Sequence, residues 1–83
     1  MPQYWISFRS LTHAQRASRV LERKGVTAML TRLPQGLSLK GCGYAIILRH
    51  RTEEGIRMIR EAQIPFGAIF VKNELGTFRE VKL

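Results

Sequence analysis

The feature that most constrains the fold of this chain is the order in which two helical segments interrupt a series of short, strand-like runs. Each run concentrates apolar, β-branched or aromatic residues between turn-forming residues, which is typical of β-strands. The predicted strands cover residues 4–8, 26–33, 44–48, 68–71 and 77–82. The helical segments follow the first and the third of them. This β-α-β-β-α-β order, with an extra C-terminal strand, predicts an α+β fold of the ferredoxin-like type, a split βαβ arrangement in which two helices cover one face of an antiparallel sheet.

The first helical segment is expected to begin near Thr12 and to end before Gly25. Thr12 and Gln15 have the three-residue spacing of a capping box, and a glycine that follows a helix commonly terminates it in the left-handed conformation. The apolar residues of the segment fall on one face. The opposite face carries three arginines, Arg16, Arg19 and Arg23. We call these three residues the basic ridge and expect them to face solvent.

The second helical segment is expected to begin at Thr52, which would cap it. Glu53 and Glu54 then lie in the first turn, where the helix dipole favours negative charge. Acidic and basic residues nearly balance in this helix, whereas the whole chain has 14 Lys and Arg against 6 Asp and Glu, a net charge of +8. Much of the positive field therefore belongs to the basic ridge. Such a field favours phosphates and acidic protein surfaces as partners.

The length of 83 residues predicts a single domain, residues 1–83, with a thin core. A single cysteine excludes a disulfide within the chain, and one cysteine with two histidines cannot supply the four ligands of a closed zinc site. We therefore expect no metal and no cofactor. No apolar run is long enough to cross a bilayer, and the N-terminus lacks the pattern of a secretory signal. These features predict a cytoplasmic protein without membrane contact.

The sequence lacks the patterns of ordinary enzymes. Its acidic residues lie in the second helix, as solvated pairs with arginines, and near the C-terminus, with Glu22 alone on the first helix; no phosphate-binding glycine loop is present. His13 and His50 are expected on the surface. Hydrolytic and nucleotide-dependent catalysis are therefore not indicated.

The most concentrated chemical feature is the sequence Lys40-Gly41-Cys42-Gly43, between the second and third predicted strands. Glycines on both sides leave the thiol with little steric cover, and their backbone N–H groups can surround an anion. With the nearby cation of Lys40, these groups would favour the thiolate, which is the nucleophilic form of cysteine. A free cysteine also commonly fills a core position as a small apolar residue. From the residues alone, a reactive and a buried Cys42 both stay open.

The same segment, extended to Ile47, is close to the consensus of RNA-recognition motifs, which lies on the third strand of the predicted topology. Cys42 stands where the first stacking aromatic would be, so Tyr44, with Trp5 on the first strand, remains as the platform. RNA binding would then depend mainly on the basic ridge. The alternative function is a non-catalytic module that binds RNA or an acidic protein. Whether Tyr44 faces the helices stays open, because all of residues 44–48 are apolar.

Short motifs in residues 3–49 match one family of small domains in order and spacing. They are Tyr-Trp-Ile-Ser-Phe-Arg-Ser at the first strand, then Thr12-His13-Ala14, Gly25-Val26, Leu33-Pro34, Leu37-Ser38 and Gly41-Cys42-Gly43. On these motifs the chain resembles the selenium/sulfur carrier-like domains of uncharacterised bacterial proteins. Residues 34–43 are the most distinctive part of the resemblance.

The resemblance implies that Cys42 carries sulfur or selenium, as a persulfide or selenosulfide, and passes the atom to an acceptor protein. A donor such as a cysteine desulfurase would load the thiolate. Lys40 departs from the small or polar residues that are commoner before the motif, and it would favour an anionic persulfide. On this interpretation the chain is at most a carrier component of a transferase. A third alternative is a scaffold that forms a homodimer through the free face of its sheet.

Overall fold

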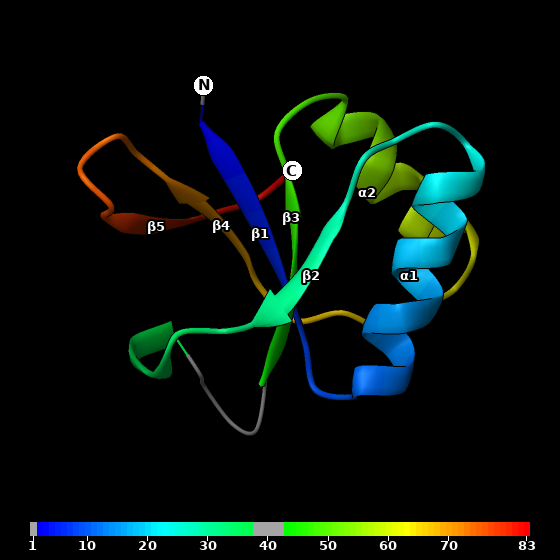
Figure 1. Ribbon diagram of the computed structural model, residues 1–83, viewed down its shortest axis with the longest axis horizontal. Coiled ribbons are helices and arrows are strands. Elements are labelled where there is room, and N and C mark those ends of the chain that lie inside the picture. The colour runs from blue at the N-terminus through cyan, green and yellow to red at the C-terminus, as the bar shows by residue number, and fades with distance from the viewer. Residues whose placement is uncertain (1, 38–42) are drawn as a thin grey trace.

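The computed structural model describes residues 2–37 and 43–83 (Figure 1). Its strands are β1 (Gln3–Phe8), β2 (Met29–Arg32), β3 (Tyr44–Leu48), β4 (Ile69–Lys72) and β5 (Phe78–Val81), and its helices are α1 (Leu11–Arg23), α2 (Thr52–Glu61) and the short 3-10 helix η1 (Gln35–Leu37). The strands form one antiparallel sheet in the order β2-β3-β1-β4-β5. Because β3 separates β1 from β2, and β1 separates β3 from β4, the predicted α+β, ferredoxin-like arrangement is confirmed. The predicted extra strand is β5, at the edge beside β4.

The main core lies between the sheet and the two long helices, which lie on the same side of the sheet in Figure 1. The pairing of β1 with β3 sets Ile6 opposite Ile46 and Phe8 opposite Tyr44, so these side chains share the face toward the helices. The fully or nearly fully buried members of this core are Ile6, Phe8, Ala14, Ala17, Leu21, Val26, Ile46, Leu48, Ile56, Ile59, Ile64 and Ile69. Complete burial of each large aliphatic side chain contributes about 1.5–3 kcal/mol to stability.

The opposite face of the sheet carries a second, smaller core. Trp5, Ile47 and Phe70 lie on this face, and each is at most 8% exposed. The ring of Phe78, from β5, packs edge-on against Trp5 with centroids 5.1 Å apart. The ammonium of Lys72 lies 5.6 Å from the centroids of both rings. The largest side chains of this face are therefore buried within the chain itself, without a second copy.

The start of α1 differs from the prediction by two residues. The N-cap is Ser10, which has an extended backbone and whose hydroxyl accepts a hydrogen bond from the His13 N–H at 3.4 Å. Thr12, the predicted cap, lies within the first turn. Ser10 takes this role because β1 ends at Phe8 and only a short connection separates the strand from the helix.

The end of α1 is a Schellman motif, and it shortens β2. Gly25 has a φ of 79°, its N–H donates to the Glu22 carbonyl at 3.0 Å, and the Val26 N–H donates to the Leu21 carbonyl at 2.9 Å. Because Val26 belongs to this helix terminus, the predicted strand 26–33 is wrong at its start, and β2 covers only Met29–Arg32. β3 has the predicted bounds, and β4 and β5 lie within a residue or two of theirs.

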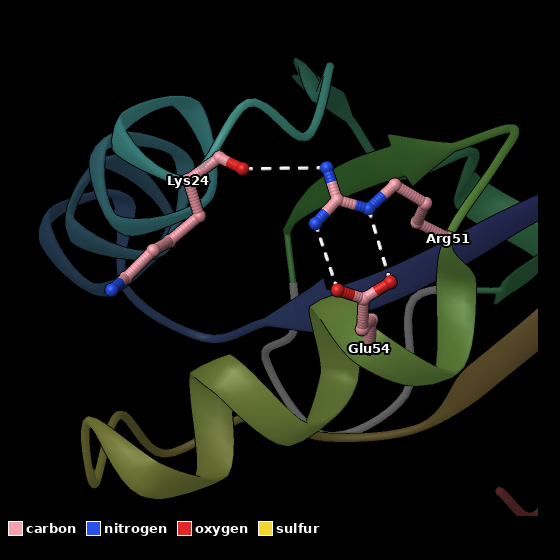
Figure 2. Close-up of polar contacts among 3 residues, drawn as sticks. All are labelled: Lys24, Arg51 and Glu54. Atoms are coloured by element: carbon pink, nitrogen blue, oxygen red, sulfur yellow. Dashed lines mark hydrogen bonds and ion pairs between the residues drawn. The ribbon is translucent and has the colours of Figure 1, made fainter.

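α2 begins at Thr52, but its N-cap is Arg51 rather than Thr52. Arg51 has a left-handed backbone, with a φ of 51°, and makes no side-chain cap. Its guanidinium instead donates to the Glu54 carboxylate at 3.0 and 2.7 Å and to the Lys24 carbonyl at 3.3 Å (Figure 2). Arg51 therefore ties the end of α1 to the first turn of α2. Its hydrogen bonds to Glu54 lower the pKa of that carboxyl below its usual value.

Candidate functional site

The candidate site is the connection between β2 and β3, at the lower end of the sheet in Figure 1. Lys40, Gly41 and Cys42 lie outside the described residues, so their predicted roles stay predictions. The structure describes the two ends of this connection. They are η1, which ends at Leu37, and Gly43, which immediately follows Cys42 in the sequence.

Gly43 is held between the strands on both of its sides. Its N–H donates to the Phe8 carbonyl at 3.2 Å, and its carbonyl accepts from the Leu33 N–H at 3.0 Å. A Cβ at this position would meet nothing within 4 Å, and Gly43 is not among the glycines with positive φ. Neither packing against the described residues nor backbone conformation therefore requires glycine here. The position after Cys42 combines a fixed backbone with free space where a side chain would be.

Tyr44 and Trp5 do not form one platform. In the β1–β3 register Tyr44 lies opposite Phe8, on the face toward the helices, while Trp5 lies opposite Ile47 on the other face. Tyr44 is half-buried, and the guanidinium of Arg32 lies 5.6 Å from its ring centroid. Trp5 is 8% exposed and donates its indole N–H to Gln3 at 3.2 Å. The joint base-stacking platform predicted from these two residues is therefore wrong, because a sheet separates them.

The basic ridge occupies the outer face of α1, as predicted. Arg16, Arg19 and Arg23 are exposed, and the opposite side of the helix is buried in the main core. Among the described residues, the ion pair within 4 Å is that between Arg51 and Glu54, so none of the three arginines is neutralised by a described carboxylate. With a rise of about 1.5 Å per residue, the ridge is about 10 Å long. Its charge is therefore available to a partner.

Metal binding finds no support in the part of the chain that the structure describes. No group of three or more His, Cys, Asp or Glu side chains gathers there. His13 lies half-buried in the first turn of α1, and His50 is exposed beyond β3. Over the same residues, no helix is both long and apolar enough to cross a bilayer.

One residue beside the site was not anticipated from the sequence. Arg9 directly follows Phe8, whose carbonyl accepts the hydrogen bond from the Gly43 N–H at 3.2 Å. Arg9 is exposed, and it stands where β1 leads into α1. To predict from the sequence that Arg9 lies beside the site, one would need the register between residues 3–8 and 44–48. Hydrophobic periodicity alone does not supply that register.

Comparison with protein families identifies the family of this chain. The model of the family described as "Putative Se/S carrier protein-like" matches residues 3–71, from β1 into β4. This range includes Cys42 and both long helices, and it extends beyond the motifs in residues 3–49. No curated protein and no solved structure matches the chain. Because the match covers most of the sequence, the chain belongs to the Se/S carrier protein-like family.

Proposed function

We propose that the protein carries sulfur or selenium on Cys42 and delivers it to an acceptor protein. The observation that carries this proposal is the family match, whose range contains the single cysteine of the chain. The chain needs no complete active site of its own, because the donor and acceptor proteins contribute the remaining groups. We place this activity in the cytoplasm, where a thiol stays reduced.

The transfer is a thiol exchange reaction that needs no external oxidant. The Cys42 thiolate attacks the terminal sulfur of a persulfide on the donor, such as a cysteine desulfurase. A new S–S bond forms, the donor S–S bond breaks, and the donor sulfur leaves as a thiolate. Attack by a nucleophile of the acceptor on the outer sulfur then returns Cys42 to its thiolate. Selenium would follow the same steps as a selenosulfide.

The surroundings of Cys42 in the sequence suit this exchange. Gly41 and Gly43 would leave an in-line approach open on both sides of the thiol, and Lys40 would stabilise the anionic persulfide. The free space at Gly43 supports this role, since no described neighbour would contact a Cβ there. The open side of this glycine would receive the backbone of the donor or acceptor.

The basic ridge is the proposed docking surface for these partners. Its three exposed arginines suit an acidic protein surface, and they would accelerate encounter at low ionic strength. RNA is the alternative partner of the ridge. The separation of Tyr44 from Trp5 removes the shared stacking platform that a base-reading module of this fold would use. We therefore favour an acidic protein, and a homodimer through the sheet is not needed for this function.

Mass spectrometry of the intact protein tests the proposal. After incubation with a cysteine desulfurase and cysteine, Cys42 should gain one sulfur, about 32 Da, in a form that a reducing agent removes. Cys42→Ser should gain nothing. Gly43→Ala is the matched variant: it should be at least as stable as the wild type, because its Cβ meets open space, and it should load more slowly. A folded wild-type protein that never acquires the adduct from the desulfurase would rule out the carrier role with that donor class.

A further inference from the structure

A cavity of about 470 Å³ opens at the end of the sheet where β1 meets α1. Its walls come from four segments that are distant in sequence: the end of β1, the first turn of α1, the end of η1 at Leu37, and residues 65–68 before β4. Phe70 and Ala68 contribute apolar surface from the second core. The volume lies within the range of about 300–1,000 Å³ that is usual for small-molecule sites.

One wall of this cavity is fixed to β1 by backbone hydrogen bonds. The Ser7 N–H donates to the Ala68 carbonyl at 2.9 Å, and the Gly67 N–H donates to the Ser7 carbonyl at 2.8 Å. The hydroxyl of Ser7, which is 2% exposed, accepts a third bond from the Ala68 N–H at 2.8 Å. The segment before β4 is therefore held as an extension of the sheet, and the cavity exists without a ligand to shape it.

The polar side chains that line the cavity include two basic residues and no acid. Arg9 and His13 line it together with Ser10, and none of its lining residues is Asp or Glu. Arg9 is exposed and makes no ion pair with a described carboxylate. The lining thus combines apolar surface with a cation that is unpaired among the described residues, which suits a molecule with one anionic end.

We propose that this cavity binds a small carboxylate with an apolar body. The planar guanidinium of Arg9 matches the two oxygens of a carboxylate, and the imidazole of His13 offers a further N–H donor. The apolar body would lie against Ala68 and Phe70. A free amino acid is a poorer fit, because no acidic group lines the cavity to receive its ammonium.

Binding at this cavity requires no sulfur chemistry and so does not depend on the carrier function. The cavity is lined by Leu37, the last residue of η1, and by Arg9, which follows Phe8 and its hydrogen bond from Gly43, so a bound carboxylate would lie near both described ends of the β2–β3 connection. If the bound carboxylate accepts sulfur, or alters the rate at which Cys42 is loaded with sulfur, that role rests on the proposed carrier function. Binding itself would persist in a protein that carries no sulfur.

The test is a titration of the ¹⁵N-labelled full chain, followed by backbone amide shifts at low ionic strength. The probes are phenylacetate and its neutral isostere phenylacetamide. Arg9→Gln is the test variant, and Arg49→Gln is the matched control, since both arginines are exposed and directly follow central strands that run in opposite directions. Cys42→Ser is titrated in parallel to separate this site from the carrier function.

Phenylacetate should shift the amides of Ser7, Gly67 and Ala68 saturably, and more strongly than phenylacetamide does. Loss of a charge-assisted contact at an exposed arginine should weaken phenylacetate binding about fivefold in Arg9→Gln, with no change in Arg49→Gln or Cys42→Ser. Equal binding of the two probes would overturn the proposal, as would unchanged affinity in Arg9→Gln. Shifts that follow the basic ridge instead of the cavity would also contradict it. Failure of sulfur loading with intact phenylacetate binding would reject the carrier function and leave this site standing.

Discussion

The two long helices end in the same backbone geometry with different residues, which provides an internal test of helix termination. After α2, the Gln63 N–H donates to the Arg60 carbonyl at 2.9 Å, and the Ile64 N–H donates to the Ile59 carbonyl at 3.2 Å. These bonds repeat the Schellman motif of α1, with Gln63 in the place of Gly25. Gln63 has a φ of 58°, in the left-handed region that glycine adopts freely. We therefore predict that Gln63→Gly stabilises the protein.

The magnitude follows from two opposing effects. A left-handed backbone costs an L-residue about 1–2 kcal/mol, and glycine removes this cost. Glycine also gains about 0.4–1 kcal/mol of conformational freedom in the unfolded chain, which opposes the gain. Because Gln63 is exposed and its side chain makes no hydrogen bond or ion pair with the described residues, the net stabilisation should be about 0.5–1 kcal/mol. For a chain of this length, that corresponds to an increase in Tm of about 2–8 °C.

Thermal and urea unfolding, followed by circular dichroism, measure this difference. Gln63→Ala is the control, since it removes the side chain but keeps the strained backbone, and its stability should stay close to that of the wild type. Gly25→Ala should destabilise by a similar amount, because its Cβ meets only Arg51 Nη1, at an ordinary 3.7 Å, and only the φ of 79° opposes it. A Gln63→Gly protein that is no more stable than Gln63→Ala would refute the argument from left-handed strain.

Three further predictions concern packing, pH and docking. Gly55→Ala should destabilise the protein by about 1 kcal/mol in urea unfolding. The added Cβ would lie 3.0 Å from Leu48 Cδ1 and 3.3 Å from Leu21 Cδ2, and the cost of this overpacking exceeds the gain in helix propensity. A variant more stable than the wild type would show that these two side chains move aside. Because the pKa of Glu54 is lowered in the folded state, its hydrogen bonds with Arg51 stabilise the fold fully above the usual glutamate pKa. This stabilisation is lost as the pH falls through the lowered pKa. Stability should therefore fall more steeply in the wild type than in Glu54→Gln below about pH 5, and parallel curves would contradict this. Replacing all three arginines of the basic ridge by Gln should slow sulfur loading by a desulfurase about tenfold at low salt. The charge-matched control, with Gln at the exposed Arg49, Arg57 and Arg79, should load at the wild-type rate. Equal slowing in both variants would assign the effect to net charge alone.

Local signals in the sequence were sufficient for the number and order of the strands and the two long helices, but not for their ends or for η1. Ser10 and Thr12 are both able to cap a helix, and the short connection after β1 selects Ser10. Thr52 also has a suitable side chain, yet the start of α2 is formed by Arg51, whose guanidinium reaches across to Lys24. That contact joins residues 27 positions apart, so no local pattern contains it.

The orientation of β3 shows the same limit for the candidate site. Every residue of Tyr44–Leu48 is apolar, so alternation could not tell which side faces the helices. The register with β1 places Tyr44 toward the helices and Ile47 beside Trp5, and this separated the two predicted platform residues. The bond from the Gly43 N–H to the Phe8 carbonyl, at the end of the same pairing, brings the following residue, Arg9, near the site.

The sequence by itself determined the α+β class, the basic ridge on one helix face and the family to which the chain belongs. These properties depend on local periodicity, on charge and on short motifs, which the order of residues contains directly. Only the tertiary structure decided which residues share a face of the sheet, how β5 covers Trp5, and which side chains surround the cavity beside β1. These depend on register and on contacts between distant segments, because a shift of one residue in a strand would exchange its two faces.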